Sequence, residues 1–449
     1  MTSSRAAFIV VDLGFGDAGK GLLTDYLVRA HGARLVVRFN GGAQAGHNVI
    51  TADGRHHTFS QFGSGSLVPG VSTHLARDVV VHPTALRVEA EHLQSLGESA
   101  VFSRISIAPE CRVTTPFQQA AGRVRELLRG DARHGSCGVG VGETVQDSLN
   151  TPELTLHFGE LLQPQRVRDK LLAQRALKQA ELSESLNGNL SAELQRELRA
   201  FSDPELADHW LQAAASVASK VRCVSDEVVS AAAGPLVLEG AQGVLLDERF
   251  GFHPYTTYSQ TTFDGATSLL ETWGFSGQVQ RIGVLRSYAV RHGAGPLPTE
   301  DPSLTAATPE RHNATGPWQQ HVRKGWPDLV LLSYALRACG GLDALGVTHL
   351  DALPALPEYR YCFEYGNLGE LALPNGIAEQ EQLTRQLNAA APRYRRLESA
   401  PQPARPEALL ELIQGHTGVP VHWASFGPTA GDVLPLTPAM QVGDDLRAV

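Results

Sequence analysis

The sequence predicts an α/β protein with a large, mostly parallel central sheet and flanking helices. Three observations lead to this prediction: apolar, strand-like segments recur along the chain, glycine-rich turns follow several of them, and helical patterns lie between them. This alternation is typical of a parallel sheet, because strands that are covered on both faces are apolar throughout and parallel neighbours need a crossover connection.

The N-terminal part shows the pattern most clearly. Residues 8–13 form a predicted strand that is apolar apart from one aspartate. The glycines of residues 14–19 end this strand, and residues 22–30 have the apolar spacing of a helix. A second short strand is predicted at residues 35–39, and it leads into a loop of small residues at 41–46.

The rest of the chain predicts a helical insertion and further strands. Residues from about 165 to 233 have helical spacing, with Ser191 as a helix N-cap. Further strands are predicted at residues 235–239, 279–290 and 345–349, and a surface loop at 392–406. Since no internal repeat and no clear linker interrupts the pattern, residues 1–449 are predicted to form one domain.

Composition and charge exclude several classes of protein. Hydrophobic residues make up 42% and charged residues 19% of the chain, which is a globular balance and not that of a disordered protein. The net charge of -9 gives no general attraction to nucleic acid or to an anionic membrane. Five widely spaced cysteines indicate neither a disulfide framework nor a zinc site, and no apolar run is long enough to span a bilayer. We therefore expect a reduced, cytoplasmic protein.

Residues 14–21 have the pattern of a phosphate-binding loop. Gly14, Gly19 and Lys20 match the spacing Gly-x4-Gly-Lys between a predicted strand and a predicted helix. Glycines let backbone amides approach phosphate oxygens, and the lysine reaches the outer phosphates. Gly21 stands where such loops usually have a Mg²⁺-binding serine or threonine, so Asp17 is the candidate metal ligand. An ordinary glycine-rich turn is the alternative interpretation.

Two other segments carry polar side chains that can meet a ligand. His47 follows the loop at 41–46, where compact backbone lets a ligand come close; a core or surface histidine is the alternative. Gln242 follows the strand predicted at 235–239, and ligands gather at the carboxyl ends of parallel strands. Its amide can read the edge of a base, although a tight turn explains the segment equally well. Residues 291–300 have a loop composition that indicates no chemistry.

Taken in order along the chain, these segments resemble the adenylosuccinate synthetase family. Residues 16–21, Gly-Asp-Ala-Gly-Lys-Gly, are similar to the family's Gly-Asp-Glu-Gly-Lys-Gly loop, and residues 44–48 to its Asn-Ala-Gly-His-Thr segment. The family's Glu-Gly-Ala-Gln-Gly-x-Leu-Leu-Asp run is present at 239–247. Other similar segments are 254–262, 287–300, 323–328, 348–351 and 425–428. The resemblance covers nearly the whole chain and implies the family's P-loop-type α/β fold and a homodimer.

The resemblance implies a GTP-dependent ligase that joins L-aspartate to IMP and yields adenylosuccinate, GDP and phosphate through a phosphorylated 6-oxopurine. Asp17 would take the purine N1 proton, His47 would act as acid or electrostatic partner at the oxo group, and Lys20 would steady the transferred phosphoryl group. GTP is then a co-substrate, and Mg²⁺ is bound by Asp17 and the carbonyl of Gly46. Positioning and charge stabilisation dominate such a phosphoryl transfer.

The resemblance also implies further binding residues. The positions that match GTP-binding residues are Gly16, Gly19, Lys20, Gly21, Asn48, His349, Asp351, Ser425 and Gly427. The positions that match substrate-binding residues are Gln44, Ser136, Cys137, Gln242, Thr257, Thr315, His321 and Arg323. Among the GTP-binding positions, Asp351 is expected to read guanine, because a carboxylate suits the donor edge of that base.

Several positions depart from the family pattern. Val139 stands where an arginine meets the carboxylate of aspartate, and Cys137 where a threonine meets the substrate phosphate. Thr151 aligns with the arginine that the partner subunit supplies, and in the arginine-rich amino-acid loop only Arg323 clearly survives. His349 replaces a lysine beside the guanine-reading position. An arginine makes bidentate, charge-assisted hydrogen bonds that valine or threonine cannot replace.

Other functions stay open. A paralogous GTP-dependent synthetase that joins a different amine to a different purine-like acceptor fits the loss of these arginines. A GTP-binding regulatory protein is another candidate, although the retained Asp17 and His47 argue against it. A dinucleotide-binding dehydrogenase would fit the Gly-x-Gly-x-x-Gly pattern of residues 14–19, but Lys20 directly after that pattern favours phosphate transfer.

Overall fold

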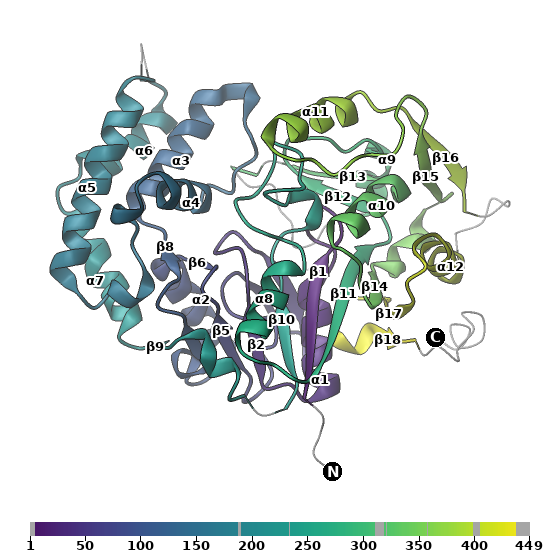
Figure 1. Ribbon diagram of the computed structural model, residues 1–449, viewed down its shortest axis with the longest axis horizontal. Helices are drawn as coiled ribbons and strands as arrows, with labels where there is room; N and C mark the ends of the chain where they lie inside the picture. The colour runs from purple at the N-terminus through teal and green to yellow at the C-terminus, as the bar shows by residue number, and fades with distance from the viewer. Residues whose placement is uncertain are drawn as a thin grey trace.

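A ten-stranded sheet forms the centre of the molecule (Figure 1). The computed structural model describes residues 5–186, 190–232, 234–309, 318–319, 321–356, 358–397 and 405–436. The order across the sheet is β18 (Val433–Pro435), β17 (Val421–Ser425), β14 (Ala344–Thr348), β11 (Gln278–Arg286), β1 (Ala6–Asp12), β10 (Leu236–Glu239), β2 (Leu35–Arg38), β5 (Ser72–Leu75), β7 (Ile105–Ile107) and β9 (Arg222–Cys223). Only the edge pair of β17 and β18 is antiparallel in this sheet. The predicted α/β class is confirmed.

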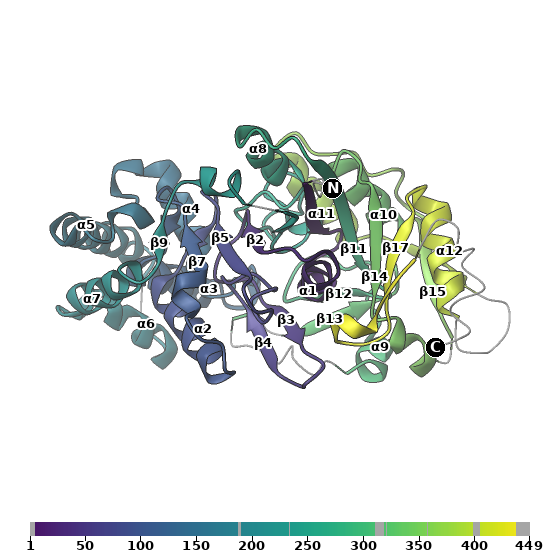
Figure 2. The same cartoon turned by 90° about the horizontal axis from the view of Figure 1, so that it is seen from below.

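Helices cover both faces of this sheet (Figure 2). They are α1 (Lys20–His31), α2 (Pro83–Ser95), α3 (Pro116–Arg129), α4 (Val141–Asn150), α5 (Pro164–Ser183), α6 (Ala192–Ser202), α7 (Leu206–Ala218), α8 (Asp264–Thr272), α9 (Pro302–Ala307), α10 (Leu329–Ala338), α11 (Ile377–Asn388) and α12 (Pro406–Thr417). Neighbouring residues of a strand point to opposite faces. Phe8 and Val10 of β1 accordingly pack with α1, whereas Ile9 and Val11 pack with α8 and α10. Burial on both faces explains why β1 is so apolar.

Four two-stranded pairs lie outside the central sheet. They are β3 (His47–Ile50) with β4 (His56–Phe59), β6 (Val80–Val81) with β8 (Arg112–Val113), β12 (Ala289–His292) with β13 (Val322–Gly325), and β15 (Arg360–Tyr365) with β16 (Pro392–Arg396). The single strand predicted at 279–290 is therefore wrong. The chain leaves the sheet at Ser287 and Tyr288, and β12 pairs with β13 instead.

The surface loop predicted at 392–406 is also wrong for its first residues. Pro392–Arg396 form β16, which pairs antiparallel with β15. A proline is compatible with this strand because it stands at the first position. Residues 398–404 of the predicted loop lie outside the described part of the chain.

The helices between 164 and 218 gather at one end of the sheet, beside β9 (Figure 1). Phe117 of α3, Leu171 of α5 and Phe201 of α6 belong to one apolar cluster that holds these helices together. Ser191 caps α6 as predicted, because its hydroxyl accepts a hydrogen bond from the Leu194 amide at 3.2 Å. The single-domain organisation of residues 1–449 stays a prediction.

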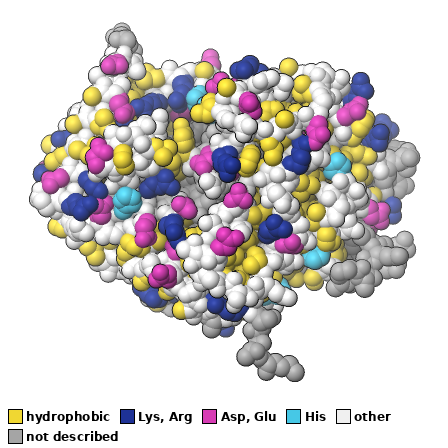
Figure 3. Space-filling model, in the orientation of Figure 1, with side chains coloured by type: hydrophobic (Ala, Val, Ile, Leu, Met, Phe, Trp, Pro, Cys, Tyr) yellow, Lys and Arg dark blue, Asp and Glu magenta, His cyan; other side chains and the backbone are white. Residues whose placement is uncertain are grey.

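The surface is of mixed charge, and acidic and basic side chains are interspersed on the face that Figure 3 shows. Within the described ranges, none of the helices combines the length and the apolar character needed to cross a bilayer.

The burial of β10 leads to a prediction about stability. Leu238 is fully buried between two parallel neighbours, so Leu238→Ala is expected to lower the free energy of unfolding by about 2–5 kcal/mol. The matched control is Leu162→Ala, because Leu162 is 60% exposed and its truncation should change the value by less than about 0.5 kcal/mol. Urea unfolding of both variants measures the difference, and equal losses would contradict the prediction.

Candidate active site

Asp12 organises the loop between β1 and α1. Its Oδ1 accepts a hydrogen bond from the Gly14 amide at 2.8 Å. Its Oδ2 accepts one from the Ala18 amide at 2.8 Å and one from Lys20 Nζ at 3.1 Å. Lys20 begins α1, with Gly19 at the N-cap in the left-handed region (φ 91°). Because Asp12 and Lys20 are both buried, this ion pair closes the loop from within.

Close packing explains two glycines of the site. A Cβ on Gly243 would lie 2.3 Å from the carbonyl oxygen of Gly14, so the turn after β10 and the phosphate loop interlock. A Cβ on Gly21 would lie 2.9 Å from the Cβ of His47 and 3.1 Å from Ser64 Oγ. The serine or threonine that usually binds Mg²⁺ in such loops therefore has no room at position 21.

Asp17 is paired with a histidine that sequence reasoning did not single out. It has a left-handed backbone (φ 61°), and its Oδ2 lies 2.5 Å from Nε2 of His292, the last residue of β12. Burial raises the pKa of Asp17, but the hydrogen bond and charge of His292, together with the charges of Arg286 and Lys20, lower it to about 2. The carboxylate is ionised at neutral pH, as a general base must be. The sequence signals for His292 are its place within the family-like segment 287–300 and directly before Gly293-Ala-Gly.

His47 forms a buried pair with Glu239. His47 Nδ1 lies 2.6 Å from Glu239 Oε1, and the Ser64 amide donates to Oε2 of the same carboxylate at 3.0 Å. Burial lowers the pKa of His47, and the charge of Glu239 opposes that effect. Burial raises the pKa of Glu239, but the charges of His47 and Arg38 and hydrogen bonds from His47 and Ser64 lower it to about 2. Glu239 therefore orients the imidazole ring, a role that the sequence did not indicate.

Two predicted substrate-binding glutamines present buried amide atoms. Within the described part of the chain, Oε1 and Nε2 of Gln242 and Oε1 of Gln44 have no hydrogen-bond partner. Both side chains lie against the small-residue loop after β2: a Cβ on Gly41 would be 3.1 Å from Gln242 Oε1, and a Cβ on Gly42 would be 3.0 Å from Gln44 Oε1. Leaving such atoms unpaired costs about 1–3 kcal/mol each. A ligand that both donates and accepts hydrogen bonds would satisfy them.

The positions that match the guanine pocket follow the carboxyl ends of the neighbouring strands β14 and β17. Thr348 Oγ1 donates to the carbonyl of Ala18 at 2.8 Å and so ties β14 to the phosphate loop. His349 follows with a left-handed backbone (φ 59°), and burial lowers its pKa well below the usual value, with a further contribution from the charge of Arg286. Its ring is thus neutral, unlike the lysine of the family.

Three further positions that match the family's GTP-binding residues, Ser425, Gly427 and Asp351, lie at this edge. Ser425 ends β17, and its hydroxyl donates to the carbonyl of Gly427 at 2.8 Å. Asp351 is exposed, in the 3₁₀ helix Leu350–Ala355. Because β14 and β17 are parallel neighbours, their carboxyl ends bring these residues to one edge, while their predicted contacts with guanine stay predictions.

The loop that carries Ser136 and Cys137 is covered by the segment before β13. A Cβ on Gly138 would lie 2.6 Å from the Trp318 ring, and Gln319 Nε2 donates to Cys137 Sγ at 2.9 Å. Arg123 contacts both the segment before β13 and the loop of Cys137. Its guanidinium lies 5.3 Å from the Trp318 ring centroid and donates to the Gly138 carbonyl at 2.7 Å. Burial raises the pKa of Cys137 to about 12, so the thiol is neutral.

Arg323 stabilises the turn after β12. It donates to the carbonyls of Gly293 at 2.8 Å and Gly295 at 2.6 Å, and to the carboxylate of Glu300 at 2.6 Å. A substrate carboxylate would have to compete with these three partners. Its predicted contact with the substrate stays a prediction.

The other predicted positions are placed as follows. The side chain of Asn48 in β3 accepts hydrogen bonds from Thr58 at 2.8 Å and from His56 at 2.9 Å. The Thr257 amide donates to the Leu246 carbonyl at 2.8 Å, and His321 is exposed just before β13. Thr315 lies outside the described residues.

The residues present suit a magnesium ion. Among the described residues, no cluster of three or more His, Cys, Asp or Glu side chains could hold a metal by itself. Mg²⁺ usually takes only one or two protein carboxylates and completes its shell with phosphate and water. Asp17 with the carbonyl of Gly46 therefore has the right donor chemistry.

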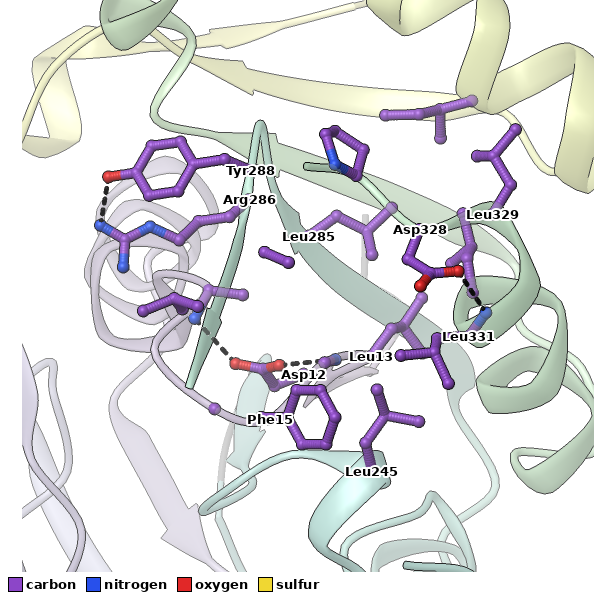
Figure 4. Close-up of a pocket in the computed structure, with 18 of the residues that line it drawn as sticks. Asp12, Leu13, Phe15, Leu245, Leu285, Arg286, Tyr288, Asp328, Leu329 and Leu331 are labelled. Atoms are coloured by element: carbon purple, nitrogen blue, oxygen red, sulfur yellow. Dashed lines mark hydrogen bonds between the residues drawn. The ribbon is translucent and has the colours of Figure 1, made fainter. Parts of the chain in front are cut away.

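An apolar cavity of about 90 Å³ lies under the phosphate loop, between it and α10 and α12 (Figure 4). Phe15, Leu245 and Leu331 line it, and Asp12 and Asp328 are among its few polar groups. Asp17, His47 and Gln242 do not line this cavity, so the polar side of the loop lies elsewhere.

Comparison with known proteins decides the family. The family model described as adenylosuccinate synthetase matches residues 9–434. The chain belongs to the adenylosuccinate synthetase family. The adenylosuccinate synthetase of Bordetella petrii is 30% identical over 441 residues, which cover 95% of this chain and 97% of that protein. That of Clostridium beijerinckii is 31% identical over 364 residues, which cover 80% of this chain and 81% of that protein.

Solved structures show the same fold. The fully ligated adenylosuccinate synthetase from Plasmodium falciparum matches with a TM-score of 0.75 at 21% identity, and the match covers 96% of this chain and 99% of that chain. A cyanophage S-2L succinoaminodeoxyadenylate synthetase, bound to dGMP and to dATP as an energy donor, matches with a TM-score of 0.57 at 16% identity. That match covers 96% of this chain and 95% of the other.

The contact of Gly21 with His47 leads to a prediction. Gly21→Ala would force α1 and β3 apart, so we expect the free energy of unfolding to fall by about 1–3 kcal/mol. The control is Gly415→Ala in α12, where an added Cβ meets nothing within 4 Å and should leave stability equal or slightly higher. Urea unfolding compares the variants, and a Gly21→Ala variant as stable as the native protein would refute the packing argument.

The lowered pKa of Glu239 predicts an acid-dependent loss of stability. Its usual pKa is 4.5 and its pKa in the folded protein is about 2, so ionised Glu239 stabilises the fold above pH 4.5. This stabilisation is lost as the pH falls from 4.5 towards 2. Urea unfolding at several pH values should show a steeper acid loss for the native protein than for Glu239→Gln. Parallel curves for the two proteins would contradict the assignment.

Proposed function

We propose that this protein is a GTP-dependent ligase that phosphorylates the 6-oxo group of a purine-type acceptor and then lets an amine displace the phosphate. The observation that carries the proposal is the ionised Asp17 on a phosphate loop that also holds Lys20, with the buried His47–Glu239 pair packed against the start of α1. These residues supply a base, a cation and an oriented imidazole for one phosphoryl transfer.

Each residue has a defined part in the proposed reaction. Asp17 takes the N1 proton of the purine, and the oxo oxygen then attacks the γ-phosphate of GTP, which releases GDP. His47 stabilises charge at that oxygen, with its ring held by Glu239. Lys20 steadies the transferred group from the first position of α1. Mg²⁺, bound by Asp17 and the Gly46 carbonyl, would neutralise phosphate charge.

The unpaired amides support a purine as the acceptor. Gln242 and Gln44 offer a donor and acceptors that are buried within the fold. The edge of a 6-oxopurine carries both hydrogen-bond donors and acceptors. On binding it would replace water as the partner of these amide atoms and satisfy their hydrogen bonds. Membership of the family supports IMP, L-aspartate and GTP as the substrates, and a homodimer in the cytoplasm.

A second candidate is a paralogous synthetase with a different amine and a different purine-like acceptor. The observation that favours it is the neutral surface formed by Trp318, Gln319 and Cys137, near positions where the family resemblance implies arginines. Arg323 is occupied by its own turn. The fold tolerates such variation, since the cyanophage synthetase was solved with dGMP and with dATP as its energy donor. A GTP-binding regulator without ligase activity is a third candidate, which the ionised Asp17 disfavours.

Phosphate release from GTP with Mg²⁺ tests the proposal. With IMP and aspartate present, phosphate and adenylosuccinate, identified by mass, should appear in equal amounts. Asp17→Asn is expected to lower the rate by about 10²–10⁴-fold, because the amide cannot accept the proton. The control Asp131→Asn changes an exposed carboxylate in the 3₁₀ helix Gly130–Ala132, which matches none of the predicted site positions, and it should retain the native rate.

The result separates the candidates. Phosphate without adenylosuccinate, followed by turnover with another purine and amine, would establish the paralogous synthetase. GTP binding without phosphate release for any acceptor and amine would contradict a ligase and favour the regulator.

A further inference from the structure

We propose that His292 is a positioning residue for the reaction: it holds the Asp17 carboxylate in one orientation and joins the phosphate loop to the antiparallel pair of β12 and β13. The inference rests on the proposed role of Asp17 as the base.

His292 and Asp17 are in direct contact. His292 Nε2 and Asp17 Oδ2 are 2.5 Å apart, and their side chains are only 22% and 25% exposed. Asp17 stands on a glycine-rich turn with a left-handed backbone, between the small residues Gly16 and Ala18. The donor from β12 therefore helps to fix the orientation of the Asp17 carboxylate. A general base has to be held within a narrow range of orientations to act.

The adjacent residue of the same strand, Arg291, also contacts the phosphate loop. Arg291 is buried, and its guanidinium lies 4.2 Å from the ring centroid of Phe15 in the phosphate loop. It also donates to the carbonyls of Ala294 at 3.0 Å and Pro296 at 2.9 Å. Two successive residues of β12 thus contact two residues of the loop, so β12 is docked on it and His292 is held in place.

The strand β12 is also connected to the loop that carries Cys137. In the β12–β13 pair, His292 lies opposite Val322 and Arg291 opposite Arg323, and the Gly293 amide donates to the His321 carbonyl at 3.1 Å. The same chain segment brings Gln319 onto Cys137. The orientation of Asp17 is thereby coupled to the segment before β13, which covers the loop of Ser136 and Cys137.

The experiment compares His292→Ala with His292→Gln, whose side-chain amide retains an N–H donor. His209→Ala is the matched control, because His209 lies in α7 and is mostly exposed. Steady-state phosphate release with GTP, Mg²⁺ and the acceptor gives kcat and KM separately. His292→Ala should lower kcat by about 10–100-fold with KM for GTP changed by less than about threefold, and His292→Gln should recover most of kcat.

Three results would overturn the inference. They are an unchanged kcat in His292→Ala, an equal loss in the Ala and Gln variants, or a rise in KM without a fall in kcat. If the native protein releases no phosphate with any acceptor, the proposed function fails. Crystal structures of the native protein and the variants then test separately whether His292 fixes the Asp17 side chain. Asp17 should have one side-chain orientation in the native protein and in His292→Gln but several in His292→Ala; a single unchanged orientation in His292→Ala would refute it.

Discussion

The buried ion pair of Asp12 and Lys20 is the interaction on which the rest of the site depends. Two charges removed from water are tolerated only when they pair and their other hydrogen-bonding sites are filled, and here the amides of Gly14 and Ala18 fill the sites on the carboxylate. The pair stands at the carboxyl end of the central strand β1, so one contact sets both the shape of the phosphate loop and the start of α1. Loss of Asp12 would leave a buried lysine and two amides unpaired.

A loop held this tightly determines what can approach it. The turn after β10 comes within reach only because Gly243 has no side chain, and β3 comes beside α1 only because Gly21 has none. The same approach brings His47 of β3 to Glu239 at the end of β10. The glycine at position 21 therefore excludes the usual metal-binding hydroxyl and at the same time admits the imidazole. The single glycine accounts both for the missing hydroxyl and for the position of the imidazole beside α1.

Local patterns predicted the α/β class, the first strands, α1 and the Ser191 cap, because each depends on burial or capping within one segment. They failed where pairing partners are distant. His292 and Asp17 are 275 positions apart, and His47 and Glu239 are 192 apart, so neither pattern specifies the other. The strand at Pro392–Arg396 was missed because its proline and charges suit a loop, while its partner β15 supplies the strand geometry. The split between β11 and β12 likewise depends on β13, not on local composition.

The contrast between the two sides of the site has a simple electrostatic meaning. Around the phosphate loop, charged groups are paired and oriented: Lys20 with Asp12, His47 with Glu239, and His292 with Asp17. Where residues 136–138 meet the segment before β13, an indole, a neutral thiol and an amide come together, and the nearby arginines 123 and 323 are bound to an aromatic ring and to carbonyls. A preorganised charge stabilises transfer of any phosphoryl group, whereas recognition of a second substrate depends on groups that match its own charge. A chain can therefore keep its phosphoryl-transfer groups while its recognition of the second substrate changes. The neutral side chains of Trp318, Gln319 and Cys137 are where such a change would act.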